Sequence, residues 1–300
     1  MNVNKSDSKV AFFCCSDKVY IPKAITALRS LEACCPQNDF FVATDTNQLT
    51  GHEVELMKDF RTPAFHLELS KDFPTGVRKW LPIMYWIYAM PALLLKQGYR
   101  YSCAIDGDVF GLQPFDLSWL SSIQGIACVK NPPRWQTGGQ LIKKHFGWFQ
   151  QRYGITKAQT EKPNTNSGVL WFDNQAMVDS GFYEIAVDVY KNITGQGWTD
   201  SWLNDQALFA IVTSILDDKL PISIIEDKWN YRFRVVLSNP EYKRMVKPPI
   251  NICHFTGVKP WESYIHHFKS ARRLRRLYLY RLHCVHKWRR FSHKLNFKFV

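Results

Sequence analysis

Short apolar runs alternate with amphipathic stretches along most of the chain. The runs have the length and content of buried β-strands, and the stretches between them carry apolar residues at helical spacing. Strands and helices that alternate across short connections predict an α/β fold with a mostly parallel sheet. The predicted strands are Val10–Cys15, Asp39–Thr44, Phe65–Leu69, Tyr101–Ile105, Ile123–Val129, Gly168–Phe172, Ile222–Ile225 and Ile250–His254. The predicted helices begin at Pro22 or span His52–Phe60, Phe182–Tyr190 and Asp205–Leu216.

Two stretches depart from this alternation. Trp80–Lys96 is almost entirely apolar, and Pro91 would kink or split a helix there, so we expect its aromatic side chains to pack in the core. Asn131–Lys162 is polar and contains Pro132-Pro133 and Gly138-Gly139. Its composition predicts an irregular segment, either a mobile loop or a lid.

Two aspartates directly follow the apolar run that ends at Ile105. In an extended segment the side chains of Asp106 and Asp108 point to the same side, and Gly107 lets a ligand approach the backbone. Neighbouring carboxylates repel each other unless a cation lies between them. At the carboxyl end of a strand, the pair predicts a divalent metal that holds nucleotide phosphates. The alternative is a surface turn with two solvated aspartates.

Polar side chains also mark the beginning of one strand and one helix. Asn166, in an Asn-Ser-Gly turn before a strand, could present its amide to a sugar hydroxyl, and Gly168 allows close approach of the backbone. Asp205 and Gln206 open a helix and could hold substrate hydroxyls. A plain turn and a helix cap are the alternatives for these two segments.

A third segment follows the last predicted strand. His254 offers an imidazole nitrogen, Gly257 a close backbone approach and Lys259 a cation for phosphate, all just before Pro260-Trp261. A histidine in the core is the alternative for His254, but three such residues within six positions are unusual.

In their order along the chain, these segments resemble the motifs of glycosyltransferase family 8. That family includes bacterial lipopolysaccharide galactosyl- and glucosyltransferases and the glycogenins. The resemblance covers roughly residues 9 to 262. It implies a GT-A fold, with a Rossmann-like, mostly parallel central sheet flanked by helices. It also implies a UDP-sugar donor, Mn²⁺ or Mg²⁺ as cofactor, and retention of anomeric configuration. The matching motifs are Asp106-Gly107-Asp108, Asn166–Leu170, Asp205-Gln206-Ala207 and His254–Trp261.

The resemblance further implies roles for the matched residues. The implied metal ligands are Asp106, Asp108 and His254. The donor sugar would meet Asn166, Asp205 and Gln206, of which Asp205 and Gln206 are the catalytic candidates near the reacting carbon. The nucleotide would meet Phe13, Cys14, Asp17, Tyr20, Ile105, Asp106, Gly257 and Lys259. In this set Tyr20 would stack on the uracil, and Gly257 and Lys259 would meet the diphosphate.

The sequence departs from the family pattern at three positions. Ile87 stands where many members have an arginine that helps to hold the donor, although Arg78 or Lys79 could substitute for it. Lys130 stands where an aspartate is common, and Ser16 replaces one of two neighbouring acids. The metal ligands are unaffected, but the donor sugar is not fixed by the resemblance.

Composition sets broad limits on the protein. With 300 residues, 46% of them hydrophobic, the chain can bury a sizeable core. It contains no apolar run long enough to span a membrane, and from its polar start we expect no signal peptide. The eight cysteines form no Cys-x-x-Cys pair and lie mostly within apolar runs, so we expect buried reduced thiols and a cytoplasmic location.

The positive charge is concentrated at the carboxyl end of the chain. Residues 263–300 contain eleven Lys and Arg and no acidic residue, which leaves +2 of the formal charge of +13 for residues 1–262. Leu and aromatic residues recur among these cations at helical spacing. We therefore expect a GT-A domain at residues 1–262 and a basic helical tail that associates with an anionic membrane. A core-packed helix with a solvated basic face is the alternative.

Together these features predict a peripheral membrane enzyme that moves a hexose, from UDP-galactose or UDP-glucose, to a glycan or glycolipid acceptor such as lipopolysaccharide. A soluble transferase of the glycogenin or galactinol type and a non-catalytic nucleotide-sugar-binding protein are the alternatives. Nucleic acid is not an expected partner, because residues 1–262 are nearly neutral and carry no nucleic-acid-binding motif.

Overall fold

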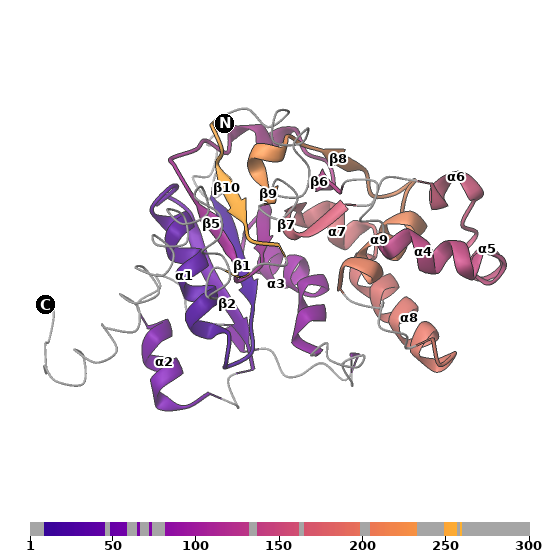
Figure 1. The fold of residues 1–300 in the computed structure, drawn as a ribbon, viewed down its shortest axis with the longest axis horizontal. Helices are drawn as coiled ribbons and strands as arrows, with labels where there is room; N and C mark the ends of the chain where they lie inside the picture. The colour runs from indigo at the N-terminus through magenta and orange to yellow at the C-terminus, as the bar shows by residue number, and fades with distance from the viewer. Residues whose placement is uncertain are drawn as a thin grey trace, which may run out of the picture.

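The fold of the chain is seen in a computed structural model (Figure 1). It describes residues 9–45, 49–58, 65–66, 72–73, 82–131, 137–161, 165–198, 205–232, 249–256 and 259. The predicted tail at residues 263–300, together with Arg78, Lys79 and Gly257, lies outside the described residues. The described part forms an α/β structure with two sheets.

A seven-stranded sheet lies at the centre, in the order β3-β2-β1-β4-β7-β6-β8. Four of its six pairings are parallel, and β7 runs antiparallel to both of its neighbours. The mostly parallel sheet is thus confirmed. Its strands are β1 Val10–Cys15, β2 Asp39–Thr44, β3 Phe65–His66, β4 Tyr101–Ile105, β6 Ile126–Lys130, β7 Thr165–Asp173 and β8 Ile222–Ile224.

A second sheet has three short strands in the order β5-β10-β9. In it β10 pairs antiparallel with β5 and parallel with β9. This sheet joins segments that are far apart in the sequence, and its strand β5 follows shortly after the carboxyl end of β4 in the chain. Its strands are β5 Val109–Gly111, β9 Tyr231–Arg232 and β10 Ile252–His254.

Helices lie on both sides of the central sheet (Figure 1). Those described are α1 Ile21–Glu32, α2 Gly51–Met57, α3 Met90–Lys96, α4 Thr137–Lys144, α5 Phe146–Tyr153, α6 Lys157–Thr160, α7 Asn174–Asp179, α8 Phe182–Gly195 and α9 Asp205–Ile215. Of these, α5 and α6 lie beyond α4, away from the sheet (Figure 1). Short 3₁₀ helices are η3 Pro82–Tyr88, η4 Ser118–Ser122 and η6 Asp227–Trp229.

Helices cover both faces of the sheet, so neighbouring residues of a strand are buried in opposite directions. Phe12 stacks on Phe40 and meets the edge of Trp171, in the core beneath α1 and α2. Phe13 and Phe172 stack on the opposite face, in the core formed with α3, α8 and α9. Burial on both sides explains why these strands are unbroken apolar runs in the sequence.

The stretch Asn131–Lys162 was predicted to be irregular, and this prediction is wrong. Its described part contains the three short helices α4, α5 and α6. Leu141, Ile142 and Phe149 are buried in the core, and Gly154 ends α5 with a positive φ of 71°. A few apolar side chains are therefore sufficient to pack these short helices against the core.

The apolar stretch before β4 forms two elements rather than one helix. Residues 82–88 adopt the 3₁₀ helix η3, and Pro91 lies in the first turn of α3, where its missing N–H costs no hydrogen bond. Tyr85, Trp86 and Tyr88 are buried, as predicted for a core segment.

The seven cysteines of the described part are free thiols, six of them buried and Cys15 half-buried. The expectation of buried thiols is confirmed for those six. No helix in the described residues is long and apolar enough to cross a membrane.

Candidate functional site

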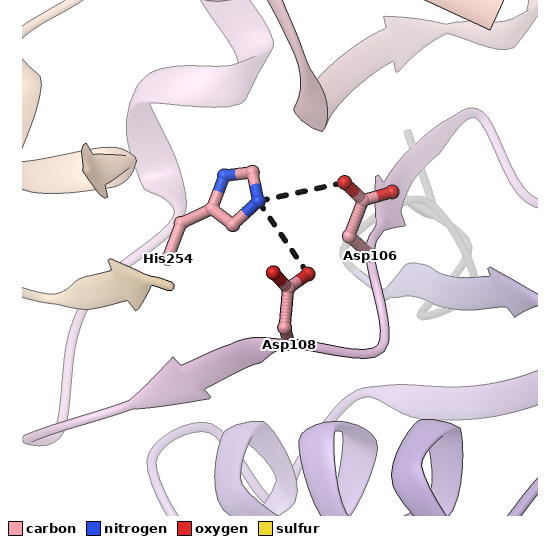
Figure 2. A group of neighbouring side chains, drawn as sticks. All are labelled: Asp106, Asp108 and His254. Atoms are coloured by element: carbon pink, nitrogen blue, oxygen red, sulfur yellow. Dashed lines mark ion pairs between the residues drawn. The ribbon is translucent and has the colours of Figure 1, made fainter. Parts of the chain in front are cut away.

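The two aspartates lie in a tight turn between β4 and β5. Asp106 follows β4 directly, and the N–H of Val109 donates to the Asp106 carbonyl at 3.2 Å. Both carboxylates were predicted to converge because the segment is extended, and that reason is wrong. They converge because the chain turns at Gly107, where an added Cβ atom would lie 3.6 Å from the Ala24 nitrogen in the first turn of α1. Figure 2 shows the two carboxylates and the His254 ring that faces them.

His254 reaches the same point from β10. The antiparallel pairing of β10 with β5 sets His254 opposite Val109, and the Phe255 N–H donates to the Asp108 carbonyl at 3.1 Å. His254 Nε2 lies 3.4 Å from Asp106 Oδ2 and 3.5 Å from Asp108 Oδ1 (Figure 2). The three side chains offer ligand atoms within 4.8 Å of one another.

Charge is compensated within this group. Burial alone would raise the pKa of Asp108, but His254 and Lys259 outweigh burial and hold this pKa below its usual value. Burial would lower the pKa of His254, yet the two aspartates raise it above the ordinary value. Lys259 Nζ lies 2.5 Å from Asp108 Oδ2. Two cationic groups therefore stand where a metal ion would supply positive charge.

Because Gly168 on β7 has no side chain, His254 and Asp106 can occupy the space beside it. A Cβ atom at Gly168 would lie 2.0 Å from His254 Cε1 and 2.8 Å from Asp106 Oδ2. The Gly168 carbonyl also accepts from the Asp106 N–H at 2.9 Å, which fixes the strand against the turn. A glycine is therefore required at this position.

The residues present fit a divalent cation. Two carboxylates suit hard ions such as Mg²⁺ and Mn²⁺, and the imidazole shifts the preference toward a transition metal. Asp108 and His254 are buried, whereas the Asp106 side chain is 49% exposed and can reach a ligand that enters from solvent. The same three residues were predicted from the sequence.

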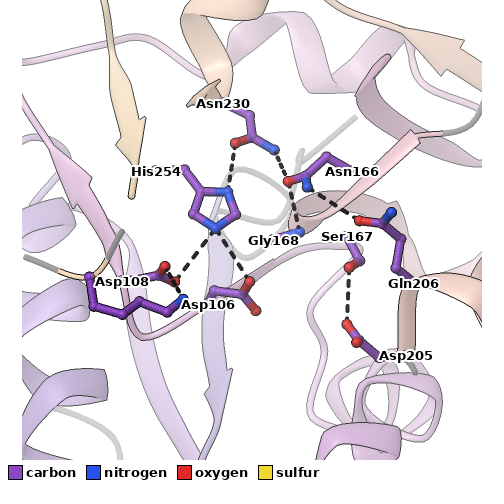
Figure 3. Close-up of polar contacts among 10 residues, drawn as sticks. Asp106, Asp108, Asn166, Ser167, Gly168, Asp205, Gln206, Asn230 and His254 are labelled. Atoms are coloured by element: carbon purple, nitrogen blue, oxygen red, sulfur yellow. Dashed lines mark hydrogen bonds and ion pairs between the residues drawn. The ribbon is translucent and has the colours of Figure 1, made fainter. Parts of the chain in front are cut away.

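A second set of polar residues adjoins the three ligands (Figure 3). Asn166 Nδ2 donates to Gln206 Oε1 at 3.3 Å, and Asn166 Oδ1 accepts from the Gly168 N–H at 3.1 Å. Asn166 was predicted to lie in a turn, but it already belongs to β7 and is buried. Asn230, which the sequence did not single out, bonds to both Asn166 and His254.

Asp205 begins α9 and faces the same region. Its carboxylate accepts from Ser167 Oγ at 3.0 Å, and its carbonyl accepts from Tyr88 Oη at 2.9 Å. Burial, followed by the charge of Asp106, raises the pKa of Asp205 to about 6. Ser167 lowers this pKa and so favours the carboxylate. Ser167 belongs to the predicted Asn-Ser-Gly motif and Tyr88 to the apolar stretch before β4, but no role was predicted for either side chain.

A cavity opens between these groups and η3. Its polar wall consists of Asp106, Ser167 and Asp205. The remaining wall is apolar or sulfur-bearing and consists of Phe13, Cys15, Met84, Ile87, Ala104 and Ile105. Ile87, where an arginine was expected from the family pattern, thus lies in this apolar wall.

The residues predicted to meet the nucleotide base lie on β1 and in the loop after it. Phe13 lines the cavity, and Cys14 is buried on the opposite face of β1. Asp17 Oδ1 accepts from the Tyr20 N–H at 2.9 Å and stabilises the turn before α1. Tyr20 is 46% exposed, and its ring lies 3.7 Å from Lys23 Nζ. Lys23 was not predicted to belong to the site. Burial and the charge of Lys259 lower its pKa.

No family model and no curated protein matches the chain at a significant level. Solved structures do match. An active-site variant of LgtC has a TM-score of 0.60 at 15% identity, with 88% of this chain and 93% of that chain covered. The galactosyltransferase LgtC with donor and acceptor sugar analogues has a TM-score of 0.57 at 15% identity, with 90% and 95% covered.

The similarity extends beyond LgtC. GlyE from Streptococcus pneumoniae has a TM-score of 0.56 at 16% identity, with 96% of this chain and 64% of that chain covered. Mouse xyloside xylosyltransferase 1 has a TM-score of 0.53 at 12% identity, with 83% and 98% covered. This protein therefore has the GT-A glycosyltransferase fold, of the kind seen in bacterial sugar transferases such as LgtC.

Proposed function

We propose that this protein is a metal-dependent, retaining glycosyltransferase that moves a hexose from UDP-galactose or UDP-glucose to a lipid-linked glycan. One observation carries the proposal. Asp106, Asp108 and His254 meet at the carboxyl end of β4, and Asp205 faces the same cavity from α9. A metal site next to a carboxylate suits transfer from a sugar diphosphate, and LgtC, which has this fold, binds donor and acceptor sugar analogues.

The charged groups would act on the diphosphate. Asp106, Asp108 and His254 would hold Mn²⁺ or Mg²⁺, and Lys259 lies beside Asp108. A bound cation would offset the negative charge that grows on the phosphates as the sugar leaves. Lys259, which contacts Asp108 here, would then bind a phosphate oxygen instead, because a cation on Asp108 would reduce the attraction of that carboxylate for the ammonium group.

Asp205, Gln206 and Asn166 would act on the sugar. Gln206 and Asn166 form an amide pair that can hold sugar hydroxyls, and Asp205 brings a carboxylate to the cavity. A carboxylate near the reacting carbon stabilises the positive charge that develops there. These roles agree with those implied by the family motifs.

The composition of residues 263–300 is the reason for assigning a lipid-linked acceptor. Residues 263–300 carry eleven basic residues, no acidic residue, and aromatic and leucine residues among them. Such a composition favours attachment to an anionic bilayer surface, and a lipid-linked glycan lies at that surface.

Release of UDP tests the proposal. Purified protein is incubated with Mn²⁺ and a panel of UDP-sugars, with and without glycolipid acceptors. We expect release from one donor, lost on chelation and in Asp106→Ala/Asp108→Ala. Asp116→Ala, which removes an exposed acid that bonds to the neighbouring Ser118, is the matched control and should keep the activity.

Other outcomes would change the assignment. Binding of UDP without release from any donor would identify a non-catalytic nucleotide-sugar-binding protein. Turnover with soluble glycan or polyol acceptors, unaffected by removal of the tail, would indicate a transferase of the glycogenin or galactinol type.

A further inference from the structure

Asn230 lies at the centre of the polar cluster without being one of its predicted members. It follows η6 and precedes β9, and its side chain is fully buried. Asn230 Nδ2 lies 2.8 Å from Asn166 Oδ1, and Asn230 Oδ1 lies 3.0 Å from His254 Nδ1 (Figure 3). One amide thus bridges a metal-ligand candidate and a sugar-binding candidate.

The direction of these hydrogen bonds is fixed by a backbone group. The Gly168 N–H can only donate, so the Asn166 atom that it meets is the carbonyl oxygen. The Asn230 atom facing that oxygen must be the NH₂ group, because two carbonyl oxygens cannot share a hydrogen bond. Asn230 therefore presents its own oxygen to His254.

This orientation determines which nitrogen of His254 carries a proton. An oxygen 3.0 Å from Nδ1 requires a proton on Nδ1. The lone pair of Nε2 is then available on the side of Asp106 and Asp108 once a cation is bound there. A hydrogen bond to the far nitrogen of a ligand histidine fixes its tautomer and ring orientation.

The other end of the amide acts on the sugar-binding pair. Asn166 accepts from Asn230 and donates to Gln206 at 3.3 Å, so its amide is held in one orientation. His254, Asn230, Asn166 and Gln206 consequently form one continuous hydrogen-bonded chain from the cation site to the start of α9 (Figure 3).

We propose that Asn230 is a positioning residue that holds His254 with Nε2 free for the cation and, through the same amide, orients Asn166 and Gln206 for the donor sugar. The inference rests on the proposed function, since it concerns the cation and the donor of that reaction. Asn230 touches neither of them itself.

Two variants separate the two halves of this role. Asn230→Ala removes both hydrogen bonds. Asn230→Asp keeps an oxygen for the His254 Nδ1 proton but offers no N–H to Asn166. We expect Asn230→Ala to bind Mn²⁺ about 10- to 100-fold more weakly. We expect Asn230→Asp to bind Mn²⁺ within about threefold of the unaltered protein, yet to lose about tenfold or more in kcat/KM for the UDP-sugar.

Binding of Mn²⁺ alone, followed by electron paramagnetic resonance without donor, is the first readout. The matched control is Asn174→Ala. Asn174 is equally buried and also makes two side-chain hydrogen bonds, to Ser102 and to the Tyr99 carbonyl, but lies at the other end of the sheet. It should leave Mn²⁺ affinity unchanged.

A second measurement does not depend on any variant. Nitrogen NMR of the Mg²⁺-loaded, unaltered protein should show a proton on Nδ1 of His254. An unprotonated Nδ1 would overturn the inference, as would wild-type Mn²⁺ affinity in Asn230→Ala or equal losses in Asn230→Ala and Asn174→Ala.

If the unaltered protein binds neither ion, the metal site of the proposed function fails as well. If the unaltered protein binds Mn²⁺ and Mg²⁺ but the Asn230 variants do not show the expected losses, the proposed function stands and the role of Asn230 is wrong.

Discussion

Gly168 shows how one residue can decide whether the site assembles. Its carbonyl bonds to the Asp106 N–H, and β7 is paired on both sides, so the backbone has little freedom to move away. In Gly168→Ala the new methyl group would collide with His254 and Asp106. We expect Mn²⁺ affinity to fall by about tenfold or more and UDP release to be lost.

Titration with Mn²⁺ measures this effect, and Gly147→Ala is the control, because nothing lies within 4 Å of a Cβ at Gly147. Unchanged Mn²⁺ affinity in Gly168→Ala would mean that His254 is not held where it lies here.

Asp205 offers a second prediction at the residue scale. Its pKa is about 6 because of burial and the nearby charge of Asp106. The carboxyl group is therefore charged at pH 7 and becomes neutral as the pH falls through about 6. Ser167→Ala removes a hydrogen bond to the carboxylate and should raise this pKa further.

Carbon NMR of the aspartate carboxyl groups in metal-free protein checks both statements. Asp116 serves as the internal reference, because Ser118 lowers its pKa. A pKa of Asp205 below about 4 would contradict the burial argument.

The elements were predictable where a single pattern spans the whole segment. β1 and β2 begin and end at the predicted residues, because both are buried on two faces and polar residues flank their apolar runs. The segment α4–α6 was missed, since short helices need few apolar residues and offer little periodicity. β7 begins three residues earlier than predicted, with polar residues that a strand normally excludes.

The helix η3 leads to a prediction at the scale of elements. In a 3₁₀ helix residues three apart lie on one side, which directs Met84 and Ile87 into the cavity. Ile87→Ala should remove part of this apolar wall, enlarge the cavity and change the preference among UDP-sugars by about tenfold. The affinity for free UDP should stay the same. Leu93→Ala, which shortens a half-buried side chain packed on the same core but outside the cavity, should alter neither property.

Competition among UDP-sugars, measured by product ratios, gives the preference directly. Equal ratios in Ile87→Ala and in the unaltered protein would show that this wall does not contact the donor.

At the scale of the whole molecule, the sequence could give the residues of the site but not their assembly. The acidic pair, Asp205 and His254 were recognised by motif and order along the chain. Their contact depends on the order of strands in two sheets, and on the pairing of β5 with β10 across more than 100 residues of chain. No local pattern encodes that pairing, and Asn230 was missed for the same reason.

The uneven charge of the chain gives the last prediction. Nearly all of the net positive charge belongs to residues 263–300, so we expect the full-length protein to sediment with vesicles containing phosphatidylglycerol and not with neutral phosphatidylcholine vesicles. Each basic residue near an anionic surface contributes about 1 kcal/mol. Replacing Arg272, Arg273, Arg275 and Arg276 by Gln should therefore weaken binding by at least about tenfold, and added salt should do the same.

The matched control replaces four basic residues outside the tail, Lys18, Lys58, Lys96 and Lys219. Equal binding by both quadruple variants would assign the membrane contact to another surface, and equal binding to neutral vesicles would show that charge does not drive it.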